Sequence, residues 1–252
     1  MNKFDMGAAW NAAAGLIASH RDLVLAIAGV FLFLPAALVG IFGPPQPGVE
    51  GVPATQTFDV LMQYYGDMLP YMLVTAVLGS VGTIAIARLY LGARGMTVGA
   101  TLVFALTVVI STVVAGILSS IAVGFALVLL LVPGLYLYAR FAMVLPYVAS
   151  TGEKNPFNLL QGSWNATRNN GWRLVVYLVL IGIIGIVVYL LASGVIGLLL
   201  TSLLPDDVSR VATALLDALL SAAFSVIYTA ILCGAYRELT GVSGQTLSEE
   251  FS

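Results

Sequence analysis

The residues best suited to chemistry form a stripe along the last apolar segment of the chain. Polar or reactive side chains recur there every four residues: Thr213, Asp217, Ser221, Ser225, Thr229, Cys233 and Arg237. A step of four residues advances about 400° around an α-helix, so the stripe drifts by roughly 40° per step. About three or four members can therefore share one helix face, with Asp217 as the ionisable element.

Two interpretations of this stripe stay open. In the first, Asp217, Ser221, Ser225 and Thr229 line a polar path through a membrane. In the second, which we favour, small side chains form a seam at which helices approach closely and hydrogen-bond to one another. Asp217 is expected near the outer boundary of the bilayer, because a charge at the centre is energetically costly.

A second group of residues combines arginine with tryptophan. Basic clusters at a cytoplasmic membrane face can hold lipid phosphates, and tryptophan favours the membrane–water interface. The members of this group are predicted to contact lipid headgroups: Arg140, Arg168, Arg173, Trp164 and Trp172. The same arginines would also serve as ordinary determinants of topology, so the pattern alone leaves both roles open.

Pro133-Gly134 lies within a long apolar run and predicts a kink in the helix that contains it. A broken helix at this point would free backbone groups, as transporters use at their binding sites. We favour a kink without a ligand.

Other chemistries find little support. The single cysteine, Cys233, and the single histidine, His20, argue against a disulfide framework and against multi-cysteine or histidine-based metal sites. No second acid or nucleophile pair accompanies Asp217, so we expect neither an enzyme nor a cofactor. No basic patch is interleaved with aromatic residues, which argues against nucleic-acid binding.

Composition determines what must position these residues. The chain of 252 residues is 60% apolar and only 9% charged, whereas a soluble domain carries about a quarter charged residues. There is too little charge to cover a water-exposed surface, so lipid must be the solvent for most of the chain. The predicted fold class is an all-α polytopic membrane protein, with no room for a sizeable soluble domain.

The basic residues predict the topology. Nine of the ten lysines and arginines fall in alternate gaps between apolar runs, and only Arg210 falls in the other gaps. The nine are Lys3, Arg21, Arg88, Arg94, Arg140, Lys154, Arg168, Arg173 and Arg237. Short basic loops stay in the cytoplasm, so both termini are predicted to be cytoplasmic, in a bacterial inner membrane.

Six transmembrane helices in three antiparallel hairpins follow from this pattern. The predicted spans are about 22–42, 69–90, 99–118, 121–147, 172–192 and 211–237. Ser119-Ser120 is taken as the break between the third and fourth spans, because the apolar run there is too long for one crossing. Residues 1–239 would form a single membrane domain, followed by a polar tail at 240–252.

Two further segments are predicted to be cytoplasmic interfacial helices, at about 3–19 and 155–170. The second is the clearer, since Asn155 suits an N-cap, Pro156 the first helical position and Gly171 the end. Its expected apolar face consists of Phe157, Leu160, Trp164 and Thr167. Such an amphipathic helix would lie in the headgroup layer.

The stretch from Val132 to Arg173 resembles a known family. The residues that carry the resemblance are Val132-Pro133-Gly134, Arg140, Pro146, Glu153, Pro156-Phe157, Leu160, Ser163-Trp164, Thr167 and Trp172-Arg173. They resemble bacterial six-span proteins related to the membrane domain of glycerophosphoryl diester phosphodiesterases. In the fused enzymes of that family a separate soluble barrel performs the catalysis, so no active-site residue maps onto this chain. The resemblance implies a free-standing membrane domain near lipid or envelope metabolism.

The leading hypothesis is a non-enzymatic scaffold, partner-binding or lipid-interacting membrane protein. Helix 155–170 and its flanking arginines would be the contact surface, with membrane lipids, and as a further candidate another membrane protein, as partners. The alternative is a small transporter or channel that uses Pro133-Gly134 and the polar stripe of the last span. An intramembrane enzyme is the least favoured reading.

Overall fold

The computed structural model describes residues 3–45, 47–48, 53–92 and 95–241, and their regular elements are helices. Arg94 and the part of the predicted tail beyond Gly241 lie outside these ranges. In chain order the elements are α1 (Met6–Ser19), α2 (Arg21–Ala28), the π-helical turn η1 (Gly29–Phe33), α3 (Leu34–Phe42), α4 (Ala54–Leu91), α5 (Val98–Leu129), α6 (Leu131–Phe141), α7 (Val144–Thr151), α8 (Pro156–Ala166), α9 (Gly171–Leu203) and α10 (Asp206–Thr240).

Six helical segments in the described ranges are long and apolar enough to cross a membrane. They are Arg21–Phe42, Thr55–Leu91, Val98–Leu129, Leu131–Thr151, Gly171–Leu203 and Asp206–Thr240. The all-α class and the number of spans expected from the sequence are therefore confirmed.

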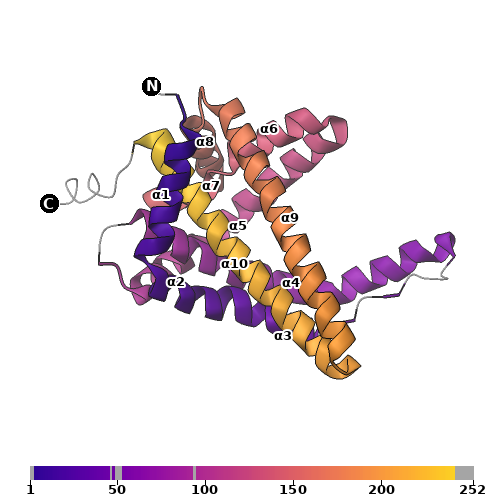
Figure 1. The fold of residues 1–252 in the computed structure, drawn as a ribbon. Helices are drawn as coiled ribbons and strands as arrows, with labels where there is room; N and C mark the ends of the chain where they lie inside the picture. The colour runs from indigo at the N-terminus through magenta and orange to yellow at the C-terminus, as the bar shows by residue number, and fades with distance from the viewer. Residues whose placement is uncertain (1–2, 46, 49–52, 93–94, 242–252) are drawn as a thin grey trace.

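The helices converge at one end of the molecule and diverge toward the other (Figure 1). Burial follows the same gradient along individual helices. The buried residues of α4 lie between Val81 and Leu91, and those of α9 lie between Gly171 and Leu178. We call the convergent end, which carries Arg88, Arg140, Arg173 and Arg237, the basic end. The opposite end, where α9 and α10 join next to Asp206 and Asp207, is the acidic end.

The third and fourth spans separate at Leu130 rather than at Ser119-Ser120. Helix α5 continues through both serines, because the Ser119 hydroxyl donates to the Gly116 carbonyl within the same helix at 2.9 Å. Leu130 is extended, with φ −157° and ψ 135°, and this residue ends α5. The predicted ranges 99–118 and 121–147 are thus replaced by longer and later segments.

Pro133-Gly134 does not kink a helix. Pro133 lies in the first turn of α6, where a missing N–H leaves no helical hydrogen bond unmade. A Cβ on Gly134 would lie 2.4 Å from the Leu127 side chain, so this glycine allows α6 to pack closely against the end of α5. The fourth span is interrupted later, between Phe141 and Val144, where α6 gives way to α7.

Helices α4 and α9 are longer than the predicted spans 69–90 and 172–192. Helix α9 extends through the segment expected to be an outer cap and ends only before Leu204 and Pro205, because a residue that precedes proline disfavours helical geometry. Its 33 residues span about 50 Å, whereas the hydrocarbon layer is about 30 Å thick. Helix α9 must therefore tilt or extend beyond that layer.

Helix α8 begins as predicted but buries a different face. The Asn155 side chain accepts a hydrogen bond from the Phe157 amide at 2.9 Å, which is the expected N-cap. The helix ends at Ala166, and its buried residues are Leu159, Gly162 and Ser163. Phe157, on the predicted apolar face, is 69% exposed. A Cβ on Gly162 would lie 2.2 Å from the Tyr147 ring, so small residues bring α8 directly onto α7.

Helix α1 packs against α10. The Asp5 side chain caps it by accepting hydrogen bonds from the Gly7 and Ala8 amides. Its buried residues are Ala9, Ala13 and Leu16. A Cβ on Gly234 would lie only 2.5 Å from the Ala9 carbonyl oxygen, so glycine in α10 is what permits this approach.

Candidate functional site at the basic end

Arginine side chains join the helices at the basic end by donating to backbone carbonyls. The Arg88 Nη1 atom donates to the Ala149 carbonyl oxygen at 2.7 Å, and the guanidinium lies 4.4 Å above the Phe104 ring. Arg237 donates to the Tyr90 carbonyl. Carbonyls at helix C-termini have no partner within the helix, so each of these bonds satisfies an orphaned acceptor and links two helices.

The N-terminal segment is attached to the start of α9 in the same manner. Arg173 Nη1 donates to the Phe4 carbonyl oxygen at 3.3 Å, and the Phe4 amide donates to the Asn170 side chain at 3.0 Å. Phe4 is buried and meets the Tyr177 ring edge-on. One of the predicted lipid contacts, Arg173, is thus bonded to the protein itself.

Arg140 is the exception among these arginines. It is only 4% exposed, its guanidinium lies 4.0 Å from the centre of the Trp164 ring, and its Nε atom is buried without a hydrogen-bond partner. In the part of the chain that the structure describes, Arg140 forms neither a side-chain hydrogen bond nor an ion pair. A guanidinium carries five N–H donors, so this buried cation has unmet capacity for an anion.

Aromatic rings extend the contact on both sides of Arg140. The Tyr136 ring lies 5.8 Å from the guanidinium and 5.1 Å from the Trp172 ring. A Cβ on Gly171 would lie 2.9 Å from Tyr136, so this glycine makes room for the ring beside the start of α9. Trp164, Arg140, Tyr136 and Trp172 together form what we call the arginine–tryptophan stack. Both tryptophans keep an exposed surface, which is 38% for Trp164 and 59% for Trp172.

A buried hydrogen bond fixes one side of the stack. The Ser163 hydroxyl donates to the Arg140 carbonyl oxygen at 2.7 Å, which holds α8 against α6.

Three of the five predicted contact residues, Arg140, Trp164 and Trp172, belong to the arginine–tryptophan stack, whereas Arg168 is exposed at the end of α8. Sequence reasoning missed Tyr136. Its spacing of four residues from Arg140, which places both on one helix face, is the signal that could have found it.

The polar stripe of α10 is divided between the two ends. Thr229 is 2% exposed at the basic end, and its hydroxyl donates to the Ser225 carbonyl of its own helix. Asp217 and Ser221 are exposed at the acidic end and line cavities there. The convergence of the neighbouring helices thus separates Thr229 from the other three predicted members. The four residues do not share one path through the described part of the protein.

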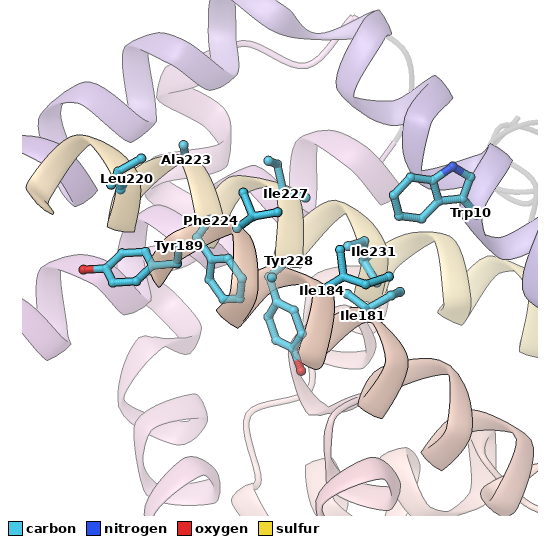
Figure 2. Close-up of a pocket in the computed structure, with 12 residues that line it drawn as sticks. Trp10, Ile181, Ile184, Tyr189, Leu220, Ala223, Phe224, Ile227, Tyr228 and Ile231 are labelled. Atoms are coloured by element: carbon cyan, nitrogen blue, oxygen red, sulfur yellow. The ribbon is translucent and has the colours of Figure 1, made fainter. Parts of the chain in front are cut away.

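An apolar groove runs between α9 and α10, with Trp10 of α1 at one end and Tyr189 of α9 at the other (Figure 2). Its volume is about 290 Å³, and Ile184, Ile227 and Tyr228 are among its lining residues. The hydroxyls of Tyr228 and Tyr138 form a hydrogen bond that links α10 with α6. The groove therefore lies along helices that also contribute to the basic end.

The arginine–tryptophan stack lies inside a region that matches a known family. Residues 113–237 match the membrane domain of glycerophosphoryl diester phosphodiesterase. The expected resemblance is confirmed over this range, and the chain is a multi-pass membrane protein. The match to this membrane domain begins within α5 and includes the stack and most of α10, but not α1 to α4. No curated protein and no solved structure matches the chain.

Proposed function

We propose that this protein is a non-enzymatic, lipid-interacting element of a bacterial inner membrane. Its six spans form three antiparallel hairpins, and the basic end faces the cytoplasm with both termini. Helices α1 and α8 lie at the cytoplasmic headgroup layer, where they act as a scaffold. The distribution of lysine and arginine supports this orientation, because short basic loops stay cytoplasmic.

The observation that carries the proposal is the state of Arg140. Burial of a charge is unfavourable unless the charge is paired, yet the described residues offer Arg140 no carboxylate and no acceptor for Nε. The phosphate of an anionic lipid supplies two non-bridging oxygens that can accept paired hydrogen bonds from the planar guanidinium. The centre of the Trp164 ring lies 4.0 Å from the guanidinium carbon and contributes a cation–π contact, and we assign the N–H groups of the guanidinium to the phosphate.

The surroundings of Arg140 suit the rest of a lipid. Trp172 and Trp164 are exposed aromatic rings of the kind that lie at headgroup level, and exposed Arg168 adds positive charge nearby. The apolar groove between α9 and α10 offers a place for an acyl chain. The exposed face of α8 around Phe157 is the surface that we assign to a second membrane protein.

Lipid retention by the purified full chain tests the proposal. Native mass spectrometry would count the molecules of phosphatidylglycerol that remain bound after release from detergent micelles. The Arg140→Gln variant should bind this lipid about tenfold more weakly, as loss of one charge-assisted pair predicts. Arg140→Lys should recover only part of the binding, because a point charge replaces the planar fork.

Arg210→Gln is the matched control, since it makes the same change at the acidic end and should leave phosphatidylglycerol binding unchanged. Thermal unfolding of each variant would show that it is folded. Equal retention by the native chain and by a folded Arg140→Gln variant would contradict the proposal.

A further inference from the structure

An open chamber lies at the acidic end between α3, α4, α9 and α10. Its volume is about 600 Å³, which is within the range of about 300–1,000 Å³ that small-molecule sites occupy. Polar side chains line it from three helices: Tyr64, Tyr189, Arg210, Thr213 and Asp217. Arg210, the one basic residue that the charge pattern places on this side, thus faces the same space as Asp217.

A second chamber continues the first toward the middle of the molecule. Gly40, Met68 and Ser221 line both, and the second chamber extends to Gly79 and Ser225 with a volume of about 470 Å³. One turn further along α10, Thr229 is buried in the packed basic end. The two chambers therefore do not continue along α10 into the basic end.

A third space opens sideways between α3 and α4. This lateral groove has a volume of about 640 Å³ and an almost wholly apolar lining that includes Leu34, Leu38 and Val74. Four of its lining residues also line the second chamber: Phe31, Pro35, Val39 and Thr75. A ligand could therefore occupy the polar chambers and the apolar groove at once.

We propose that these connected spaces bind one zwitterionic glycerophospholipid from the membrane leaflet at the acidic end. Its phosphate pairs with Arg210, its ammonium group with Asp217, and an acyl chain lies in the lateral groove. Arg210 and Asp217 are seven residues apart on α10, which separates their backbones by about 10 Å along the helix axis. Both side chains can therefore approach one headgroup from opposite ends.

The charge content of the chamber selects this class of lipid. An anionic headgroup would pair with Arg210 but would leave Asp217 opposed to its own charge, and such juxtaposition of like charges is unfavourable. A lipid without a charged headgroup would leave both charges unpaired. The site is independent of the arginine–tryptophan stack, which lies at the other end of the helices and is expected to prefer anionic lipid.

Competition between defined lipids would test the proposal on the full chain in detergent. The probes are phosphatidylethanolamine, phosphatidylglycerol and diacylglycerol with identical acyl chains, counted by native mass spectrometry. In the Arg140→Gln background, which weakens lipid binding at the arginine–tryptophan stack, the chain should retain one molecule of phosphatidylethanolamine in preference to the other two. Arg210→Gln and Asp217→Asn should each weaken its binding about tenfold, as loss of one charge-assisted contact predicts.

Two further variants make the test decisive. Ser221→Phe should displace the lipid by filling the second chamber from an exposed position, away from the packed basic end. Arg140→Gln should leave phosphatidylethanolamine binding unchanged, which separates this site from the one proposed above. The proposal is overturned if the Arg140→Gln chain shows no preference for phosphatidylethanolamine over phosphatidylglycerol, or if folded Arg210→Gln and Asp217→Asn variants retain phosphatidylethanolamine as well as the native chain does.

Discussion

Gly234 at the basic end and two glycines of α9 toward the acidic end have opposite surroundings. At the basic end, a Cβ on Gly234 would lie 2.5 Å from the Ala9 carbonyl oxygen and 2.8 Å from the Ala13 amide nitrogen. Toward the acidic end, Gly194 and Gly197 of α9 have no atom within 4 Å of the corresponding position. Glycine thus serves close helix packing at Gly234 and has no such role at Gly194 and Gly197.

Polar side chains show the same division. Arg88 and Arg237 of the basic end are bonded to carbonyls of neighbouring helices, whereas Arg210 and Asp217 of the acidic end face a cavity. The difference teaches that the basic end is a structural joint, and that Arg140, a buried arginine that donates no side-chain hydrogen bond among the described residues, stands out for that reason. At the acidic end the open space is where we propose that a lipid binds.

Replacement of Gly234 by alanine should give the largest effect. The new Cβ meets backbone atoms of α1, which cannot rotate away, so overpacking should lower stability by about 1–3 kcal/mol. Thermal unfolding in detergent would measure the shift. The control is Gly194→Ala, which should leave the midpoint unchanged or raise it, because alanine is the better helix former. Equal midpoints for the two variants would remove the contrast in packing between the ends.

Replacement of Arg88 by glutamine should have the next largest effect. The change removes the hydrogen bond to the Ala149 carbonyl and the contact with the Phe104 ring, which together join α4 to α7 and α5. Leaving such a carbonyl without a partner costs about 1–3 kcal/mol. The same substitution at Arg210 is the matched control and should have little effect on unfolding. If Arg210→Gln were the more destabilising variant, the basic end would not be the structural joint.

The smallest effect concerns Glu153, in the loop between α7 and α8. Hydrogen bonds from the Asn155 amide, the Asn158 side chain and the Lys154 amide hold the pKa of the Glu153 carboxyl below its usual value. A carboxyl with a lowered folded-state pKa stabilises above its unfolded pKa of about 4.3, and loses that contribution as pH falls through the folded value. The Glu153→Gln variant should therefore lose less stability than the native chain as the pH falls below about 4.3.

Unfolding midpoints measured from neutral to acidic pH would detect this change. Asp59→Asn, which removes an exposed carboxylate from α4 at the acidic end, is the control. A pH profile that is altered by Asp59→Asn and not by Glu153→Gln would contradict the role given to the loop.

Sequence patterns predicted the helical class and six spans because hydropathy and charge act locally. They misplaced the break between the third and fourth spans, since Leu130 carries no turn signal within its apolar run. Ser119 looked like a break but bonds to its own helix. A serine followed by apolar residues does not reveal whether its hydroxyl serves a turn or the preceding helical carbonyl.

The candidate site was predictable in membership but not in arrangement. Residue type alone selected Arg140, Trp164 and Trp172, because arginine and tryptophan are both favoured at membrane interfaces. Their contact depends on how α8 and the start of α9 pack on α6, through Gly162 and Gly171, and no local pattern encodes that packing. The burial of Thr229 apart from Ser221 likewise depends on where the neighbouring helices converge.

Thiol labelling measures most directly whether one end is open and the other closed. Cys233 is completely buried at the basic end and serves as the first probe in the native chain. The second probe is Thr213→Cys, in the first chamber at the acidic end, combined with Cys233→Ala. With a membrane-impermeant maleimide on intact cells, Thr213→Cys should react, and Cys233 should stay unreactive even after the cells are opened. Comparable labelling of Cys233 in opened cells, or labelling of Thr213→Cys only after opening, would contradict the account.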